Sequence, residues 1–284
     1  MRKDVQTPRS INGETASGVA QQAARMAGGL LMERFGHIQR ITSKGRGNVV
    51  TEVDVAVESA VIEMLSEEFP DVPILGEELS GSAKDAPRAD QPGWLWIVDP
   101  LDGTRNYASG VPHFSVVIAL ALDGEVVIGV NHDPVRDELF LAECGKGALM
   151  NGQPITISDK QSLEPAVFGI DMSYDDQGAA NTLDVIRALW PGIQTVRIMG
   201  SAALGLSWAA AGRFDIFLHD NLEPWDQAAG LLLVEEAGGL RVDRSGKRAS
   251  LLSDGIIAAN AALLRDFLRK TDGHPWRAPT VHLA

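Results

Sequence analysis

The sequence contains only one cysteine, Cys144, among its 284 residues. A single thiol cannot form an intrachain disulfide, so the cysteine content does not tie the protein to an oxidising compartment. The sequence also has no apolar run long enough to cross a bilayer, and residues 1–13 contain no apolar segment of the kind found in secretion signals. These absences predict a cytoplasmic protein without a membrane segment.

Basic residues are outnumbered, with 25 lysines and arginines against 38 acidic residues and a formal net charge of −13. Nonspecific binding to nucleic acid or to an anionic membrane needs a basic face, so the composition argues against both partners. The same charge would repel an anionic substrate, and a phosphate substrate would therefore need a bound metal to supply local positive charge. Aromatic residues make up only 6% of the chain, which offers no obvious platform for stacking a nucleotide base.

The most informative stretch is an apolar run at residues 94–98 followed by Asp-Pro-Leu-Asp-Gly. We predict a strand that ends at residue 98, because proline cannot donate to a ladder and glycine permits a turn. Two acids three residues apart repel each other unless a cation lies between them. Magnesium prefers oxygen ligands, which here would be Asp99, Asp102 and the backbone carbonyl of Leu101. An ordinary acidic turn is the alternative interpretation.

Other polar segments also follow strands or begin helices. Glu77 and Glu78 come after a short apolar run, where a solvated pair is the alternative to metal ligands. Asp226 lies at a helix start after a proline, a common place for aspartate. Residues 200–202 open a helix directly after a strand, so their amides could bind an anion, with capping by Ser201 as the alternative.

Apolar periodicity and turn residues predict an α+β N-terminal lobe with an antiparallel sheet, followed by an α/β C-terminal lobe. Asp123-Gly124 and Asn151-Gly152 are expected to form tight turns between strands. Asp54 is expected to cap a helix at residues 55–68. The predicted division is a flexible N-terminus at 1–13, lobes at 14–160 and 161–271, and a loosely held tail at 272–284.

Three acidic segments, Gly76-Glu77-Glu78, the Asp99 turn and Pro224-Trp225-Asp226, follow one another in an order that resembles the inositol monophosphatase family. The resemblance covers roughly residues 14–270. It implies a layered αβαβα sandwich of the sugar-phosphatase type, a homodimer, and magnesium-dependent, lithium-sensitive hydrolysis of a small polyol or sugar phosphate monoester by metal-activated water.

The resemblance also implies a role for individual residues. One Mg²⁺ would be held by Glu77, Asp99 and the Leu101 carbonyl, a second by Asp99, Asp102 and Asp226, and a third, weaker one would lie near Glu77. Glu77 is also a catalytic residue in this scheme, and Thr104, supported by Asp54, would orient or deprotonate the attacking water. The implied substrate-binding residues are Asp102, Gly103, Thr104, Gly200, Ser201, Ala202 and His219, with Lys44, Glu78 and Trp225 in supporting positions.

The sequence departs from the family pattern at His219. Many inositol-type members carry a glutamate six residues before the tryptophan of the last motif, where it binds a substrate hydroxyl. Another polyol phosphate, a sugar bisphosphate, histidinol phosphate or a nucleotide 3′-phosphate therefore stays open as the substrate. A non-catalytic, metal-binding regulatory subunit is the rival function, and the presence of Thr104 and Asp54 argues against it, because a purely structural cation site needs no water-orienting hydroxyl.

Overall fold

A seven-stranded sheet organises the N-terminal half of the computed structural model, which describes residues 5–37, 41–45, 48–78, 86–173 and 175–278. Its strand order is β3-β4-β5-β6-β7-β8-β9, and helices α1 and α2 pack on one face. The elements are α1 (Ala16–Arg34), α2 (Glu52–Glu68), β3 (Ile74–Gly76), β4 (Trp94–Asp102), β5 (Ser115–Leu122), β6 (Glu125–Asp133), β7 (Glu138–Glu143), β8 (Ala148–Met150) and β9 (Gln153–Pro154).

A five-stranded sheet organises the C-terminal half, in the order β11-β10-β12-β14-β13. Its first three strands are parallel, whereas β14 runs antiparallel to both β12 and β13. The elements are β10 (Val167–Ile170), α4 (Asp176–Leu189), β11 (Thr195–Ile198), α5 (Ala202–Ala210), β12 (Ile216–His219), α6 (Pro224–Glu236), β13 (Leu240–Val242), β14 (Ile256–Ala259), α7 (Ala261–Lys270) and the 3₁₀ turn η1 (Pro275–Arg277).

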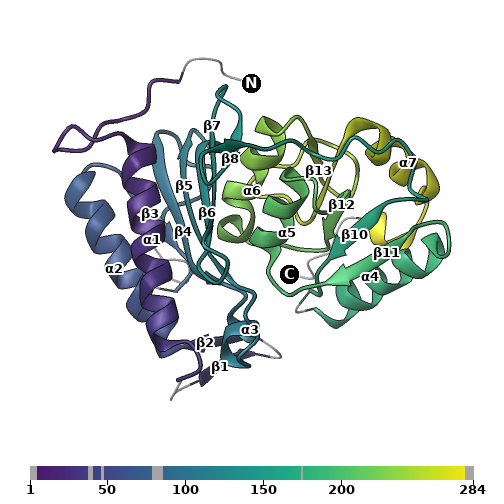
Figure 1. The fold of residues 1–284 in the computed structure, drawn as a ribbon, viewed down its shortest axis with the longest axis horizontal. Coiled ribbons are helices and arrows are strands. Elements are labelled where there is room, and N and C mark those ends of the chain that lie inside the picture. The colour runs from purple at the N-terminus through teal and green to yellow at the C-terminus, as the bar shows by residue number, and fades with distance from the viewer. Residues whose placement is uncertain (1–4, 38–40, 46–47, 79–85, 174, 279–284) are drawn as a thin grey trace.

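The layers follow one another as αβαβα (Figure 1). Helices α5 and α6 lie between the two sheets, while α4 and α7 lie on the far side of the second sheet. A short pair of strands, β1 (Ile41–Gly45) and β2 (Asn48–Thr51), lies beside the small helix α3 (Thr104–Ala108) at one end of the first sheet. This arrangement confirms the predicted sandwich.

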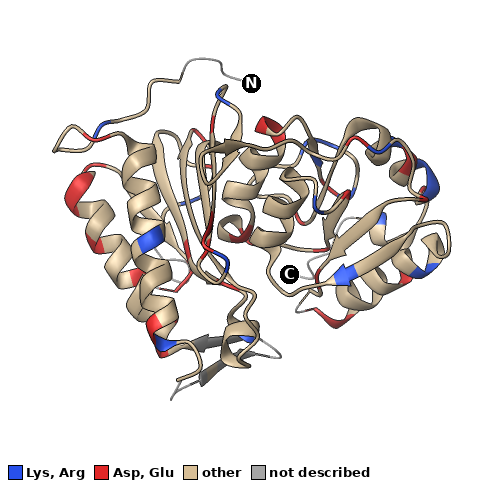
Figure 2. Cartoon of the chain, viewed as in Figure 1, with Lys and Arg blue, Asp and Glu red and all other residues tan. Residues whose placement is uncertain are grey.

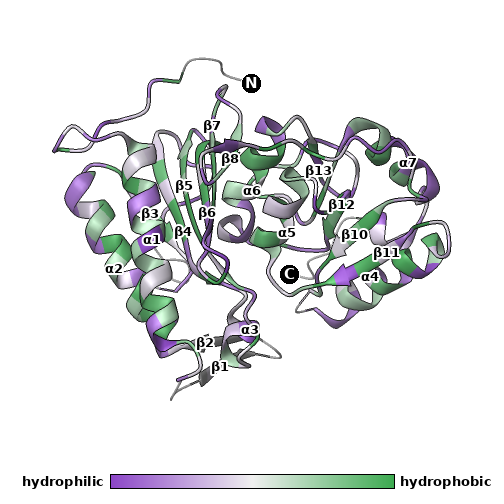
Figure 3. Ribbon diagram, viewed as in Figure 1, coloured by the Kyte–Doolittle hydropathy of each residue, from purple (hydrophilic) through white to green (hydrophobic). Residues whose placement is uncertain are grey.

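Three apolar cores hold the layers together, one beneath α1 and α2, one around α5 and α6, and one beneath α4 and α7. Figure 3 shows the strands of both sheets and the two middle helices as largely hydrophobic. The middle core takes residues from both halves of the chain, including Ile97 and Ala258. The predicted division into lobes at residues 14–160 and 161–271 stays a prediction.

The middle helices approach the first sheet closely at Gly129. A Cβ atom at this position would lie 2.8 Å from the backbone Cα of Ala229 in α6. Only glycine lets the strand and helix backbones meet at this distance, so Gly129 fixes how deeply α6 lies on β6.

The predicted helix start and the predicted looseness of both chain ends differ from the structure. Helix α2 begins at Glu52 rather than 55, because Thr51 is its N-cap and Asp54 accepts the Thr51 backbone N–H as part of a capping box. The tail is not loose over its described part, because Trp276 is fully buried and its indole N–H donates to Thr182 at 3.1 Å. The described part of residues 1–13 is also anchored, with the Ile11 amide donating to the Glu68 carbonyl at 3.0 Å.

The first sheet is antiparallel except for the parallel pair β3 and β4. The prediction assumed short links, but residues 77–93 connect these strands and are long enough to return the chain to the same end of the sheet. The Asp123-Gly124 and Asn151-Gly152 turns are confirmed, with positive φ at all four residues.

Candidate active site

Strand β4 places two of the predicted acids on the same side of the sheet. The strand runs through to Asp102 rather than ending at residue 98. Asp99 is opposite Val117 and Asp102 is opposite Ser115, so β4 spans three residues where β5 spans two. Residues three apart in a regular strand point to opposite faces, and this one extra residue turns both side chains to the same side. Pro100 is tolerated there because a bulge leaves one residue unpaired.

The third acid comes from the start of α6. Pro224 is the first residue of this helix, and the Asp226 carboxylate accepts the Glu223 backbone N–H at 2.8 Å. This capping interaction fixes the Asp226 side chain. One carboxylate oxygen from each of Asp99, Asp102 and Asp226 lies within 4.8 Å of the other two.

The electrostatics of this cluster favour a cation. Asp99 and Asp102 are buried, and no ion pair in the described part of the chain joins the three acids to a lysine or arginine. Burial and the nearby charges of Glu77, Asp102 and Asp226 hold the pKa of Asp99 well above its usual range, and burial raises the pKa of Asp102 to about 6. A hard divalent cation removes this repulsion, and an all-oxygen donor set fits Mg²⁺.

Thr104 lies directly beside the cluster at the start of α3. Its hydroxyl lies 3.2 Å from an Asp54 carboxylate oxygen and 3.0 Å from the Leu101 carbonyl oxygen. The hydroxyl proton can be donated to either of these acceptors. Asp54 is fully buried, which raises the pKa of its carboxyl, and hydrogen bonds from Thr51 partly offset that rise. The structure therefore brings together the predicted pair of hydroxyl and supporting acid.

The paired glutamates Glu77 and Glu78 lie at the same cavity as the acid cluster. Both are half-buried. Glu77 raises the pKa of Asp99 and of Asp226, although it lies outside the group of three converging acids. The Glu78 amide donates to Glu58 at 3.1 Å. The side chain of Lys44 lies outside the part of the chain that is described in atomic detail.

The C-terminal half holds Asp102 in place. The Ser201 hydroxyl donates to Asp102 in a short hydrogen bond, and the Ala203 amide donates to the same oxygen at 3.1 Å. The anion at the start of α5 is thus a carboxylate of the protein itself. Ser201 is also the N-cap of α5, as in the alternative interpretation of this segment, while its contact with substrate stays a prediction. Substrate contact by Ala202, which lines the cavity, stays a prediction.

The turn before α5 is held from two sides by residues that sequence reasoning missed. Asp171, at the exit of β10, accepts the Met199 and Gly200 amides at 2.9 and 2.5 Å, so the Gly200 amide is not available to a substrate. Asn106 donates to the His113 and Met199 carbonyls, both at 2.8 Å. Asp171 could have been found by the signal used for Asp99, an acid at a strand exit. Asn106 carries no such signal.

Gly103 allows the two halves to meet at this turn. Its φ of 93° lies in the left-handed region, and a Cβ there would lie 3.1 Å from the carbonyl oxygens of both Gly200 and His113. Another residue would separate Asp102 from its donors on α5.

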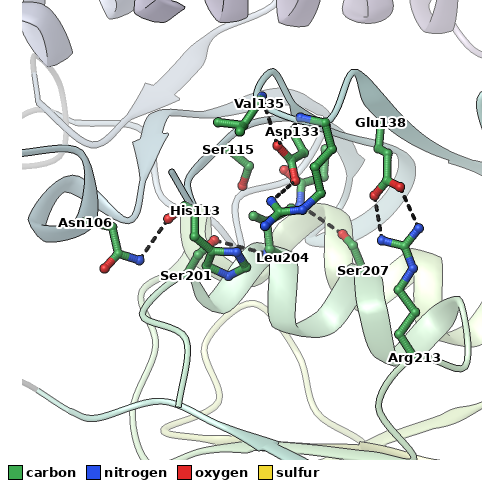
Figure 4. Close-up of polar contacts among 12 residues, drawn as sticks. Asn106, His113, Ser115, Asp133, Val135, Glu138, Ser201, Leu204, Ser207 and Arg213 are labelled. Atoms are coloured by element: carbon green, nitrogen blue, oxygen red, sulfur yellow. Dashed lines mark hydrogen bonds and ion pairs between the residues drawn. The ribbon is translucent and has the colours of Figure 1, made fainter. Parts of the chain in front are cut away.

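Figure 4 shows the contact between the two halves beyond the cluster. Arg213 and Glu138 form a two-pronged ion pair with both distances at 2.6 Å, and Ser207 accepts a hydrogen bond from Asn131 at 2.9 Å. His113 is buried against the Trp208 ring and does not line the cavity, so we assign it a structural role.

A cavity of about 730 Å³ opens in front of the acids. Its lining includes Gly103 and Thr104 at the acid cluster, and His219 and Trp225 on the C-terminal side. Most of the predicted site residues therefore line one cavity, whereas Asp54 and Ser201 lie behind Thr104 and Asp102, to which they are hydrogen-bonded. His219 is the last residue of β12 and is 7% exposed.

The fold and this site define an enzyme of the layered αβαβα class with a carboxylate cluster suited to a divalent cation. The profile of the inositol monophosphatase family matches residues 13–275. The chain is 38% identical over 264 residues to Nus factor SuhB of Pseudomonas aeruginosa, covering 90% of this chain and 95% of that protein. It is 39% identical over 240 residues to the fructose-1,6-bisphosphatase/inositol-1-monophosphatase of Thermotoga maritima, covering 84% and 89%.

Solved structures agree with the sequence matches. The extragenic suppressor protein suhB of Bartonella henselae superposes with a TM-score of 0.83 at 36% identity, covering 90% of this chain and 98% of the other. The chain belongs to the inositol monophosphatase family and is a phosphoric monoester hydrolase. Each helix in the described part of the chain is too short or too polar to span a membrane.

Proposed function

We propose that the protein is a Mg²⁺-dependent phosphatase that hydrolyses a small polyol or sugar phosphate monoester. The observation that carries this proposal is the convergence of Asp99, Asp102 and Asp226 within 4.8 Å, beside the Thr104 hydroxyl. Glu77, Asp99 and the Leu101 carbonyl would hold one ion, and Asp99, Asp102 and Asp226 a second. A third, weaker ion would lie near Glu77.

Bound Mg²⁺ would neutralise the phosphate dianion, acidify a water molecule and stabilise the departing alkoxide. The chain's own residues would do the rest. The Gly103 and Thr104 amides would hold phosphate oxygens, and the Thr104 hydroxyl would orient the attacking water while Asp54 fixes that hydroxyl. Glu77 would assist removal of the water proton, while Glu78 and Trp225 would support the ligands beside them.

Phosphate release from a panel of monoesters tests this function. We expect release that requires Mg²⁺, stops with EDTA and is lost in an Asp99→Asn/Asp226→Asn double variant. The control is Asp71→Asn, which changes an exposed acid that does not line the cavity. Full activity in the double variant would refute the proposed site. Tight Mg²⁺ binding without turnover of any monoester would instead favour the regulatory function.

We further propose a cytoplasmic, lithium-sensitive homodimer, as expected for the resemblance. Light scattering of the purified protein tests the dimer, and a lithium titration of phosphate release tests the sensitivity. A monomer at assay concentration would contradict the first expectation, and activity unchanged at high lithium would contradict the second.

A further inference from the structure

Helix α3, which carries the Thr104 hydroxyl, is anchored within its own half of the chain by Tyr107. The Tyr107 hydroxyl donates to the Leu31 carbonyl of α1 at 2.7 Å. The Tyr107 ring is buried against the rings of Phe35 and Phe114. All of these contacts join α3 to other parts of the N-terminal half, so they do not set its position relative to the C-terminal half.

The turn before α5 is anchored in a similar way within the C-terminal half. Asp171, at the exit of β10, accepts the backbone amides of Met199 and Gly200. Residues 199–210, which form this turn and α5, include no charged residue, and α5 is tan throughout in Figure 2. A side-chain ion pair therefore cannot hold this turn against α3.

Asn106 joins these two separately anchored segments. Its side-chain amide nitrogen lies 2.8 Å from the Met199 carbonyl oxygen and 3.1 Å from the Gly200 carbonyl oxygen, both in the C-terminal half. The same nitrogen lies 2.8 Å from the His113 carbonyl oxygen, and Figure 4 shows this bond. An amide nitrogen carries two protons, so three acceptors share them. One donor group thus holds together three carbonyl oxygens that would otherwise repel one another.

The turn and the Asn106 side chain are tightly packed. A Cβ atom at Gly200, whose φ of 82° lies in the left-handed region, would lie 3.0 Å from the Asn106 amide nitrogen. Ser201 follows directly in the chain and donates to Asp102. A displacement of α3 relative to this turn would therefore move the Thr104 hydroxyl relative to the segment that supports Asp102.

We propose that Asn106 is a positioning residue, whose amide holds the Thr104 hydroxyl in register with the C-terminal half of the site. This role rests on the phosphatase function proposed above. Asn106 acts through α3 and needs no contact with the substrate. Because Tyr107 and Asp171 keep each segment anchored in its own half, loss of the Asn106 amide should slow the chemical step more than it weakens folding or substrate binding.

The first test measures phosphate release from the fastest monoester of the panel, with Mg²⁺ present. Asn106→Ala should lower kcat about 10- to 100-fold, because a small displacement of a positioned group is enough for such a loss. KM should stay within about threefold of wild type and Tm within about 4 °C, since water can replace the amide at this half-buried position. A wild-type kcat in Asn106→Ala would overturn the proposal. No release by the wild type would instead refute the phosphatase function, and the role of Asn106 with it.

Two matched variants separate hydrogen bonding from packing. Asn106→Asp keeps the shape of the side chain but turns an acceptor toward the three carbonyl oxygens, so it should lose at least as much kcat as Asn106→Ala. Tyr107→Phe removes a hydrogen bond from the same helix within the N-terminal half and should keep kcat within about threefold of wild type. Full kcat in Asn106→Asp, or an equal loss in Tyr107→Phe, would show that the amide bridge between the halves is not what matters.

A double variant tests whether Asn106 acts through Thr104. Asn106→Ala/Thr104→Val should be no more than about threefold slower than Thr104→Val alone, because the hydroxyl that Asn106 positions is already absent. A general weakening of the fold would instead multiply the two losses. Multiplied losses would therefore overturn the proposal.

Hydrogen exchange of the full chain, with and without Mg²⁺, gives a measurement that does not depend on activity. The backbone amides of Tyr107 and Ser109, which close α3, should exchange about 5- to 10-fold faster in Asn106→Ala than in the wild type. The amides of β10 should exchange at the wild-type rate, because Asp171 and the sheet still hold this strand. Unchanged exchange in α3 would show that Asn106 does not hold this helix and would overturn the proposal.

Discussion

Replacing Asp102 with asparagine should stabilise the metal-free protein while it abolishes metal binding. Burial raises the pKa of Asp102 to about 6 in the folded protein, compared with 3.8 for the unperturbed group. The folded state therefore binds more protons than the unfolded state between these values, and the stability contributed by this group is lost as pH rises through about 6. Above that pH, the ionised carboxylate destabilises the fold.

The size of the effect follows from the shift. A shift of about two units corresponds to roughly 3 kcal/mol in the free energy of unfolding. Asparagine keeps an acceptor for the Ala203 amide but weakens the hydrogen bond from Ser201, which costs about 1 kcal/mol. The net gain should be about 1 to 3 kcal/mol, or roughly 2 to 6 °C in Tm for a chain of this length.

Scanning calorimetry in EDTA at pH 8 and at pH 4.5 measures this directly. Asp102→Asn should have the higher Tm at pH 8, and the difference should largely vanish at pH 4.5, where the wild-type carboxyl is protonated. Added Mg²⁺ should raise the Tm of the wild type but not of the variant. Asp71→Asn, an exposed acid, should stay within about 0.5 kcal/mol of wild type. A variant less stable than wild type at pH 8, or a difference independent of pH, would refute the reasoning.

Three further predictions address packing, ligand positioning and catalysis. Gly129→Ala should lower the free energy of unfolding, measured in urea, by about 1 to 3 kcal/mol, because its Cβ would lie 2.8 Å from the α6 backbone. Gly29→Ala is the control: this position in α1 has open space around it, so the substitution should raise the free energy of unfolding by up to about 1 kcal/mol. Ser201→Ala should weaken Mg²⁺ binding in calorimetry roughly tenfold, since Asp102 loses a donor, and unchanged affinity would contradict this. Thr104→Val should lower kcat about 10²- to 10⁴-fold with little change in Tm. A small effect on kcat would show that the Thr104 hydroxyl has no role in catalysis.

The sequence predicted the layers and the acids of the site better than it predicted their orientation. Apolar periodicity and turn residues predicted the two lobes, and the acidic turn after residue 98 indicated Asp99 and Asp102, whereas the layered sandwich and Asp226 as a further ligand came from the resemblance to the family. The bulge in β4 was missed, because Pro100 indicates only that pairing is interrupted and not whether the strand continues beyond it. Without that bulge, the two acids of β4 would point to opposite faces.

The contacts between the N-terminal and C-terminal halves could not be predicted from the sequence, because they join residues that are far apart along the chain. Asn106 holds the Met199 carbonyl 93 positions further along the chain, and Ser201 holds Asp102 across 99 positions. Hydrogen bonds between residues so far apart in the sequence leave no periodicity or local spacing from which they could be predicted. The signal at Ser201 indicated a helix cap, which is correct, but a cap and a ligand support look identical in sequence.

The arrangement of the acids links cation binding to the contact between the two halves. Asp99 and Asp102 come from the first sheet, whereas Asp226 and the donors to Asp102 come from α6 and the start of α5. Mutual repulsion among these carboxylates opposes the approach of β4 to α6, while the close contacts at Gly103 and Gly129 require that approach. A cation shared by the three acids converts this repulsion into attraction across the same interface. The acid cluster therefore lies where a shared cation would stabilise the contact between the two halves.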